Sequence, residues 1–344
     1  MNIKSEEIKK ILVIKFGGIG DVLLSTAVLE NLKDYFRKSE INFLTVPSAR
    51  DVVEGNPYVS RVLTFDLYKD DSIRLIKKVR KERYDMIIDL FTNPRSNLVC
   101  FLSGAKYRVG YDFPHRNFGY NIKVKARARG GEMHNLDFNL LALESIGVPV
   151  ISKEQNIYTD NVHVDFAENF LRQNDISEKK LIGIIISGGW ETKKYKSDDY
   201  ITLIKMLKKE FNTNIILMWG TEDELSECKK IKSEIGDAFI APPSGLKYLA
   251  ALINKCSAVI CNDSGPMHIT NAMKVPLLAI FGPTNPGLQG PYSEKNLTIV
   301  NENINCLGCQ LLECKIGNIC MTQLSKEKII SEFRKLIQIN GIQI

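Results

Sequence analysis

Short apolar runs of strand length alternate with helical patterns along this chain, and the alternation begins twice. The first series of apolar runs lies at residues 11–16, 41–46, 61–65, 86–91 and 106–110. The second series lies at residues 181–186, 214–219, 257–261 and 276–281. Strands that alternate with helices form parallel sheets covered by helices. The sequence therefore predicts an α/β protein with two doubly wound domains.

The length of the chain agrees with two domains, because 344 residues exceed what a single core usually organises. Polar and charged residues interrupt the pattern within 150–178. We therefore place the domains at 1–165 and 166–325, followed by a final segment at 326–344. In such sheets ligands bind beyond the carboxyl ends of the strands, and we expect the two domains to face a central cleft there.

Composition and charge narrow the classes of function. No apolar run approaches the roughly 18 residues of a membrane span, and no signal peptide is visible, so we expect a cytoplasmic protein. The net charge of +6 includes a basic segment, expected to be a loop, with Lys123, Lys125, Arg127 and Arg129. This excess fits an anionic substrate, an anionic membrane face or an ordinary solvated surface equally well. No long basic run indicates nucleic-acid binding.

A turn late in the chain has the features of a diphosphate site. Residues 263–266, Asp-Ser-Gly-Pro, lie between a buried strand and a predicted helix. This placement puts backbone N–H groups and the positive end of a helix dipole at the carboxyl edge of a sheet, where an anion binds well. His268, one turn into the helix, can add a donor. An ordinary helix cap with Pro266 in the first turn is the competing interpretation.

A glycine-rich turn near the N-terminus has a different character. Gly17, Gly18 and Gly20 follow the first strand, and Asp21 opens the next helix. The glycines do not have the spacing of the dinucleotide fingerprint. Asp21 also places a carboxylate where a bound phosphate would lie, and like charges repel. We therefore expect Asp21 to serve a role other than phosphate binding. The glycines allow another molecule to approach the backbone beside the carboxylate. A simple helix cap is the alternative.

Further polar residues follow other predicted strands at the same edge of a sheet. The turns after residues 16, 91, 186, 219 and 261 all end parallel strands. The side chains expected to face one cleft there are Asp21, Asn93, Arg95, Lys193, Glu224 and Asp263.

Four of the eight cysteines are clustered near the C-terminus. Cys306, Cys309, Cys314 and Cys320 lie within fifteen residues, with Gly308 between the first pair. Such spacing favours a structural metal ion, zinc by default or iron, because sulfur ligands accept both. Reduced cysteines packed in a loop are the alternative. The cluster is expected beside the second domain rather than in the catalytic cleft.

The chain resembles glycosyltransferase family 9, the group that includes the lipopolysaccharide heptosyltransferases. The resemblance runs nearly end to end. The segments that carry it are FGGIGDVLLSTAVLENLK (16–33), YDMIIDLFTNPRS (84–96), HNLDFNLLALESIGV (134–148), WETKKY (190–195), MWGTEDE (218–224) and NDSGPMHITNAMKVPLLAIFGPTNP (262–286).

This resemblance implies two Rossmann-like domains of the GT-B type. It further implies an ADP-heptose donor bound by the C-terminal half and a glycan or glycolipid acceptor bound by the N-terminal half. An enzyme that glycosylates a membrane-bound acceptor would be expected at the cytoplasmic face of the inner membrane, bound there peripherally. In that family the final helix often packs back on the first domain, so 326–344 is expected to do so here.

The resemblance also assigns roles to single residues. Asp21 matches a proposed catalytic base, and Lys193 matches the lysine of a Lys-x-Trp pattern, although Tyr195 replaces the tryptophan and Lys194 competes for the assignment. The donor-binding residues are expected to be Ser187, Lys194, Glu224 (at the ribose), Asp263, Ser264, Gly265 and His268. The acceptor-binding residues are expected to be Gly18, Gly20, Asn93, Arg95 and His134, the last of which could instead cap a helix predicted at 132–146.

The same residues permit a metal-independent reaction. Asp21 can take a proton from an acceptor hydroxyl, while Lys193 and the turn at Ser264 can offset the charge of a departing diphosphate. No strand-end loop carries a convincing Asp-x-Asp, so a catalytic metal is not expected. One base and no evident second nucleophile favour a single displacement with inversion.

Two other classes of function remain open from the sequence. An NAD-dependent dehydrogenase would share the strand–helix alternation, but it lacks the fingerprint glycines and Asp21 would repel its cofactor. A non-enzymatic module could use the cysteine cluster to contact another macromolecule. Within the transferase interpretation, the sugar and the acceptor stay open, whether a lipid A core, another surface glycan or a protein side chain.

Overall fold

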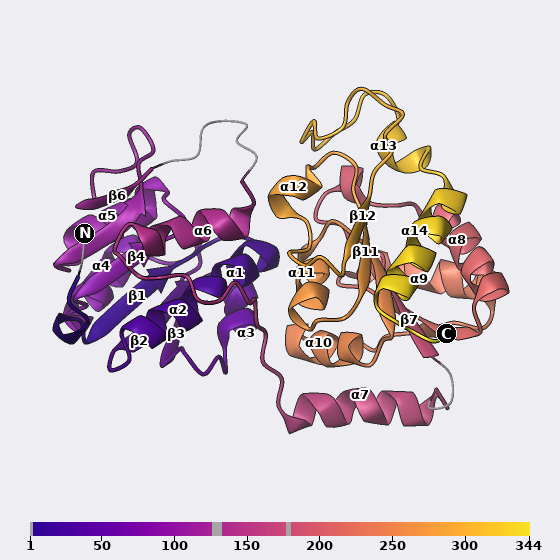
Figure 1. Cartoon of the computed structure of the whole chain (residues 1–344), viewed down its shortest axis with the longest axis horizontal. Coiled ribbons are helices and arrows are strands. Elements are labelled where there is room, and N and C mark those ends of the chain that lie inside the picture. Colours follow the sequence, from indigo (N-terminus) through magenta and orange to yellow (C-terminus); the bar gives the residue numbers. More distant parts are fainter. Residues whose placement is uncertain (1–2, 126–132, 177–179) are drawn as a thin grey trace. The chain divides into compact units, whose positions relative to one another are not determined.

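The chain forms two compact units, residues 1–158 and 159–344, each built around its own parallel sheet (Figure 1). The computed structural model describes residues 3–125, 133–176 and 180–344. The boundary between the two units falls after residue 158.

The first unit contains a six-stranded sheet in the order β3-β2-β1-β4-β5-β6, and all of its neighbouring strands are parallel. The strand order reverses between β1 and β4, which makes this pair the topological switch point of the sheet. The strands are β1 Lys10–Ile14, β2 Glu40–Thr45, β3 Arg61–Thr64, β4 Met86–Asp89, β5 Tyr107–Tyr111 and β6 Ile122–Val124.

Helices of the first unit pack against this sheet and against one another. They are α1 Ile19–Ser25, α2 Ala27–Tyr35, α3 Arg50–Val53, α4 Ser72–Glu82, α5 Pro94–Leu102 and α6 Asn135–Glu144. The helix that follows the glycine turn is divided at Thr26. The hydroxyls of Ser25 and Thr26 donate to carbonyl oxygens three residues earlier, at 2.6 and 2.7 Å, and such bonds compete with the helical pattern.

The second unit repeats the strand order of the first. Its sheet runs β12-β11-β10-β7-β8-β9, again parallel throughout, with the switch point between β7 and β10. The prediction of two doubly wound Rossmann-like domains is confirmed. The elements are α7 Asn161–Gln173, β7 Lys180–Ile185, α8 Ser197–Glu210, β8 Thr213–Met218, α9 Glu222–Ile235, β9 Phe239–Ile240, α10 Leu246–Asn254, β10 Ala258–Asn262, α11 Gly265–Ala272, β11 Leu277–Ile280, α12 Pro286–Gln289, β12 Leu297–Ile299, α13 Ile319–Thr322 and α14 Lys326–Ile339.

Three short outer strands were not expected from the sequence. β6, β9 and β12 have two or three residues each, and at most one side chain of each strand is buried, so they lack a strong apolar pattern. Lys123, expected in a loop, lies in β6 because pairing with β5 extends the sheet. Arg127 and Arg129 lie outside the described residues.

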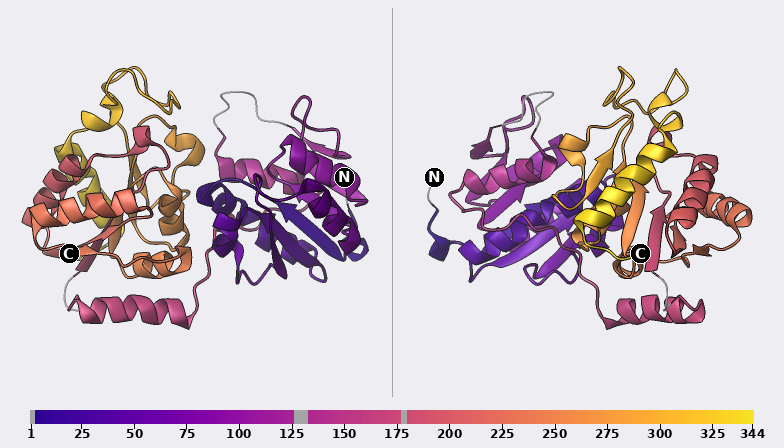
Figure 2. Two further views of the ribbon diagram at one scale, coloured as in Figure 1. Left: turned by 180° about the vertical axis from the view of Figure 1, so that it is seen from behind. Right: turned by 45° about the vertical axis from the view of Figure 1, so that its right-hand side comes forward.

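Helix α14 belongs to the second unit, and its packing back on the first domain stays a prediction. It contacts α8, β11 and β12, and Figure 2 shows it in yellow across the second sheet. The ring of Phe333 is fully buried and meets Phe211 edge to face, with the centroids 5.6 Å apart. Lys326 also forms an ion pair with Asp199 at 2.5 Å. Apolar burial against its own domain therefore fixes this helix.

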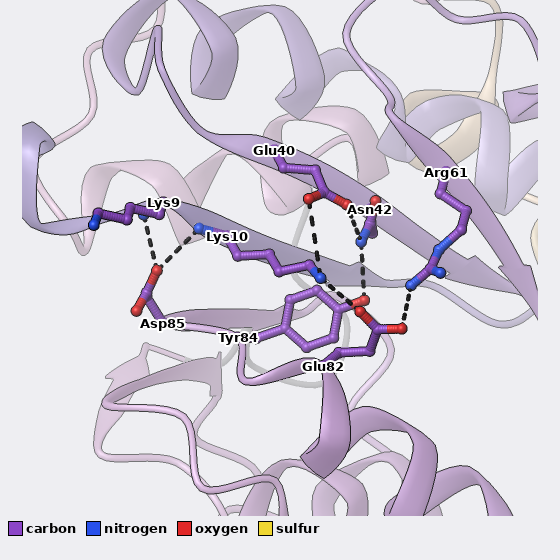
Figure 3. Close-up of polar contacts among 8 residues, drawn as sticks. All are labelled: Lys9, Lys10, Glu40, Asn42, Arg61, Glu82, Tyr84 and Asp85. Atoms are coloured by element: carbon purple, nitrogen blue, oxygen red, sulfur yellow. Dashed lines mark hydrogen bonds and ion pairs between the residues drawn. The ribbon is translucent and has the colours of Figure 1, made fainter.

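A cluster of charged residues links the amino ends of strands in the first sheet (Figure 3). The Glu82 carboxylate accepts from the Lys10 ammonium at 2.5 Å and pairs with the Arg61 guanidinium at 2.6 Å. Hydrogen bonds from these two cations lower the pKa of Glu82 to about 2. This cluster lies at the opposite ends of the strands from the turns that carry the candidate site, so we assign it to stability.

We expect Glu82→Gln to lower the free energy of unfolding at pH 7 by about 1 kcal/mol, a value typical of partly exposed ion pairs. Because the pKa is lower in the folded state, the contribution is present above the unfolded pKa of 4.5 and is lost as the pH falls toward 2. Urea unfolding of both proteins across this range measures the difference. Glu302→Gln removes an exposed partner of Lys328 and should change little; equal effects of both changes would contradict the assignment.

A search of the described helices finds none with the length and apolar character needed to cross a membrane.

Candidate active site

Apart from His134, which precedes α6, most of the predicted site residues of each unit follow the two central strands of its sheet. In the first unit they lie in the turns after β1 and β4, and in the second unit in the turns after β7 and β10, with Glu224 after β8. Parallel strands end at the same edge, and ligands bind where the strand order reverses. Each unit therefore gathers its own candidates at one place. That both groups face a common cleft stays a prediction.

Asp21 is exposed and held at the start of α1. Its Oδ2 accepts a hydrogen bond from the backbone N–H of Gly18 at 3.3 Å. Gly17 has a φ of 132°, and a Cβ there would lie 3.0 Å from Oδ2 of Asp21. A side chain at residue 17 is thus excluded by both conformation and space. The carboxylate acts as a helix cap, as the simpler interpretation held, and still faces solvent.

A lysine that the sequence analysis did not single out lies near Asp21. The Lys15 ammonium donates to the carbonyl oxygen of Leu90 at 3.0 Å. Burial lowers the pKa of Lys15, while the negative charges of Asp21 and Asp89 oppose this effect. The sequence signal was a lone lysine at the end of an otherwise apolar strand.

Beneath these groups, Asp89 anchors the turn after β4. One of its oxygens accepts the N–H groups of Phe91 and Thr92, both at 3.0 Å, and the other accepts the hydroxyl of Tyr120 at 2.7 Å. The side chain is fully buried, and burial raises its pKa despite these hydrogen bonds. Asp89 therefore fixes the shape of the turn that leads to Asn93 and Arg95.

The other acceptor-side candidates hold local structure. Asn93 caps α5 by accepting the N–H of Ser96 at 2.7 Å, and His134 caps α6 through Nδ1, which accepts the N–H of Leu136 at 3.1 Å. The guanidinium of Arg95 donates to the carbonyl oxygen of Leu67. Gly20 lies within α1. Acceptor contacts by these residues stay a prediction.

In the second unit, Asp263 joins three elements at the turn after β10. Its Oδ2 pairs with the Lys193 ammonium at 2.7 Å and accepts from Thr284 at 2.5 Å and from Gln289 at 3.2 Å. The side chains of Lys193 and Asp263 are only 12% and 5% exposed. Lys194, the competing lysine, pairs instead with Glu191 at 3.1 Å. The structure therefore brings Lys193 to the proposed diphosphate turn.

Helix α11 begins directly at this turn. The Ser264 side chain does not cap its N-terminus; its hydroxyl instead donates back to the carbonyl oxygen of Asn262 at 3.3 Å. Gly265 is the first helical residue, and His268 lies in the next turn, 5% exposed. The positive end of the helix dipole and the Lys193 charge thus lie close together, an arrangement suited to a diphosphate.

Glu224 and Ser187 form a second polar pair in this unit. The Ser187 hydroxyl and the Gly220 N–H both donate to Oε2 of Glu224 at 2.8 Å. Glu224 is 4% exposed and lies in the first turn of α9. These contacts bring the turns after β7 and β8 together, as expected for residues that share a ligand.

Asn262, the last residue of β10, organises the site and was missed in the sequence. Its side-chain oxygen accepts from the Tyr195 N–H at 3.2 Å and the Tyr200 hydroxyl at 3.1 Å. Its amide donates to the carbonyl oxygen of Ile186 at 2.9 Å. Asn262 is fully buried, and the sequence signal for it was an asparagine directly after an apolar run. Asn262 therefore ties the Lys193 loop to the Asp263 turn.

The expected metal site at the four cysteines is not supported. Cys306, Cys309, Cys314 and Cys320 line one small hollow of about 10 Å³. However, among the residues that the structure describes, no three Cys, His, Asp or Glu side chains are arranged to hold a metal ion. Two of these sulfurs form hydrogen bonds with Asn318: its N–H donates to the sulfur of Cys314 at 3.2 Å, and its Oδ1 accepts from Cys320 at 3.4 Å.

The cysteine segment supports the candidate donor site instead. The hydroxyl of Thr192, next to Lys193, donates to the carbonyl oxygen of Leu311 at 2.8 Å. The N–H of Gln310 donates to the carbonyl oxygen of Pro283, next to Thr284, at 2.6 Å. The segment is thus attached to both loops that position Lys193 and Asp263.

Thiol labelling should distinguish the two groups of cysteines. We expect iodoacetamide to modify exposed Cys309 first in the folded protein, whereas Cys100, Cys228, Cys256 and Cys261 should be protected. Burial raises the pKa of all four protected thiols, that of Cys228 to about 12, and the thiolate is the reactive form. Peptide mass spectrometry after timed labelling measures this order. Early modification of Cys261 would contradict the described packing.

The fold and these turns define the class, a two-domain α/β enzyme of the GT-B type. Residues 72–320 match the sequence profile of glycosyltransferase family 9 (heptosyltransferase). The chain belongs to this family and is a glycosyltransferase.

Individual relatives agree over nearly the whole chain. The lipopolysaccharide core heptosyltransferase OpsX of Haemophilus influenzae is 24% identical over 98% of this chain and 99% of its own length. Lipopolysaccharide heptosyltransferase 1 of Campylobacter coli is also 24% identical, over 95% and 98%. The crystal structure of a family 9 glycosyltransferase from Veillonella parvula superposes with a TM-score of 0.85 at 22% identity, covering 98% of this chain and 99% of that one.

Proposed function

We propose that this enzyme transfers a heptose from an ADP-heptose donor to a lipopolysaccharide core or a related surface glycan. The family and the names of the relatives support this donor and acceptor class. The single structural observation that carries the proposal is the Lys193–Asp263 pair at the uncapped N-terminus of α11. It offers a diphosphate both a fixed cation and a helix dipole.

In the proposed reaction, Asp21 takes the proton of an acceptor hydroxyl, and the oxygen attacks the anomeric carbon of the heptose. The bond from that carbon to the diphosphate oxygen breaks, and ADP leaves with the bonding electrons. A single displacement of this kind inverts the anomeric configuration.

The developing charge on ADP is offset by protein groups, so the reaction as proposed needs no catalytic metal. Lys193 and the α11 N-terminus face the diphosphate, and His268 adds a donor. Glu224 contacts the ribose, with Ser187 and Lys194 nearby. Gly265 allows close approach of the diphosphate, and acceptor contacts come from Gly18, Gly20, Asn93, Arg95 and His134.

We also propose that the enzyme works in the cytoplasm, peripherally at the inner membrane, where a lipid-linked acceptor would be available. The net charge of +6 is compatible with an anionic membrane face.

A panel of ADP- and UDP-sugars, each incubated with a delipidated heptose-acceptor core, tests the proposal. We expect release of ADP from ADP-heptose in the presence of EDTA, and NMR of the product should show inverted anomeric configuration. Preference for a UDP-sugar, retention of configuration, or tight binding of NAD in place of ADP would overturn it.

A further inference from the structure

The outer face of helix α4 in the first unit is strongly basic. Five of the eleven residues of this helix are lysine or arginine. Four of them are exposed and recur at a spacing of three or four residues, so they lie on one face of the helix. The residues of this basic face are Arg74, Lys77, Lys78 and Lys81. In the described part of the chain, no carboxylate forms an ion pair with them.

Helix α5, which packs beside α4, has an apolar outer face instead (Figure 1). Leu98, Phe101 and Leu102 recur at helical spacing, and all three side chains are exposed. The guanidinium of Arg80 on α4 donates to the carbonyl oxygen of Leu102 at 3.1 Å, which joins the two helices. The basic face of α4 and the apolar face of α5 are therefore neighbours on the surface of the first unit.

The loop between β5 and β6 extends the apolar face. The ring of Phe118 meets the ring of Phe101 edge to face, with the centroids 5.8 Å apart, and the two side chains are 53% and 52% exposed. Asn97 of α5 holds this loop, because its side chain donates to the carbonyl oxygen of Arg116 at 2.7 Å and accepts the N–H of Gly119 at 2.9 Å. The aromatic pair therefore forms a fixed apolar surface, and exposed Arg116 adds a further cation from the same loop.

The carboxylates of the same segments are engaged by other groups. Asp71 accepts a backbone N–H at the start of α4 at 2.8 Å. Glu82, at the end of α4, pairs with Lys10 and Arg61 at the amino ends of the strands. Asp112, in the loop that carries Phe118, accepts from the side chain of Asn117. The basic face therefore keeps its positive charge for a partner.

Unpaired cations beside exposed leucine and phenylalanine side chains match the surface of an anionic membrane. Apolar side chains enter the boundary between head groups and acyl chains, while lysine and arginine stay at the level of the head groups. Each such cation strengthens binding to an anionic leaflet about fivefold. A symmetric contact between two copies would instead bring two basic faces near each other. A nucleic acid would gain little from the leucines, because its bases stack on aromatic rings.

We propose that the basic face of α4 and the apolar face formed by α5 and Phe118 dock the first unit on an anionic lipid surface. Lys77 and Lys81 supply electrostatic attraction, and Phe101 and Phe118 enter the layer of head groups. This docking surface deepens the proposed function and rests on it for the presence of a lipid-linked acceptor. Because the first unit is the one proposed to bind the acceptor, docking concentrates the enzyme where that acceptor lies.

Sedimentation with lipid vesicles tests the docking surface without donor or acceptor. We expect the wild type to bind vesicles of phosphatidylcholine and phosphatidylglycerol about tenfold or more tightly than vesicles of phosphatidylcholine alone, and half-molar sodium chloride should remove most of this preference. Lys77→Gln/Lys81→Gln should weaken binding to the anionic vesicles about tenfold or more, because it removes two cations. Phe101→Ser/Phe118→Ser should weaken it by about the same factor, because it removes the aromatic contact with the lipid.

Lys229→Gln/Lys232→Gln is the matched control, because it removes two exposed lysines one turn apart on α9 of the second unit and lowers the net charge equally. It should bind anionic vesicles as the wild type does. The lysine variant of α4 changes only exposed side chains without ion pairs, so its Tm should equal wild type. Equal binding to both kinds of vesicle, an equal loss in the control, or a dimer in solution that dissociates in Phe101→Ser/Phe118→Ser without any vesicle binding would overturn the proposal.

Transfer assays separate the docking surface from the proposed function. Both double variants of the first unit should transfer heptose to a delipidated acceptor core as fast as the wild type. Transfer to an acceptor embedded in anionic vesicles should fall about tenfold in both. Failure of the wild type to use ADP-heptose would overturn the proposed function and leave the vesicle result standing. Failure to bind anionic vesicles would overturn the docking surface, even if transfer to the delipidated core proceeds.

Discussion

Asp21→Asn should reduce glycosyl transfer by about 10²–10⁴-fold, the usual contribution of a general base, while ADP-heptose affinity stays within a fewfold of wild type. Asparagine retains an oxygen that can accept the Gly18 N–H, so the cap on α1 is preserved. It cannot take a proton from the acceptor at neutral pH. Steady-state turnover and donor binding by calorimetry measure the two effects independently.

Asp85→Asn is a suitable control for this change. The Asp85 carboxylate accepts the N–H groups of Lys9 and Lys10 at 2.8 and 2.9 Å, at the amino end of the same sheet (Figure 3). It should leave transfer nearly unchanged. Activity of Asp21→Asn within about tenfold of wild type would remove Asp21 from the role of base.

Lys193→Ala and His268→Ala are each expected to weaken ADP binding by about tenfold or more. Charge-assisted hydrogen bonds contribute roughly 1.5–3 kcal/mol, which corresponds to this change in affinity. Lys193→Ala also leaves the Asp263 carboxylate, 5% exposed, without its ion-pair partner, so a lower Tm is expected as well. Calorimetry with ADP measures binding, and thermal unfolding measures stability.

The double variant Lys193→Ala/Asp263→Asn separates these two effects, because it removes the uncompensated charge. Its Tm should recover in part, whereas its ADP affinity should stay low. Lys326→Ala breaks a comparable lysine–aspartate pair with Asp199 away from the turn, and its ADP affinity should equal wild type. Unchanged ADP affinity in both single variants would show that the diphosphate binds elsewhere.

Much of the fold could be predicted because long apolar runs form the central strands. β1, β7 and β10 are almost completely buried, and the sequence signals them clearly. The outer strands β6 and β12 could not be predicted in this way. They form because they pair with the neighbouring strands β5 and β11, and their own sequences have no apolar pattern. The division between α1 and α2 coincides with hydrogen bonds from the hydroxyls of Ser25 and Thr26 to backbone carbonyl oxygens. The helical spacing of apolar residues does not reveal such bonds.

For the candidate site, sequence placed the turns but not the contacts between them. Asp263 and Lys193 are seventy residues apart, and only the folded sheet brings the two together. The roles of Asn262 and Lys15 were not predicted, because a single polar residue next to an apolar run does not match any recognisable sequence motif. The cysteine spacing led to the wrong prediction of a metal site for a related reason. Spacing does not show where each sulfur points, and it does not reveal the hydrogen bonds that Cys314 and Cys320 form with Asn318.

The identical strand order of the two sheets has a practical consequence. Equivalent loops, those after the first and fourth strands of each unit, carry a carboxylate in one unit and a lysine with a helix N-terminus in the other. The same strand order thus carries two different loop sets. Since each set is supported by its own core, changes in one unit leave the other intact. Under the proposed division of substrates, changes in the first unit would alter acceptor choice without disturbing the donor site, which makes that unit the better starting point for redesign.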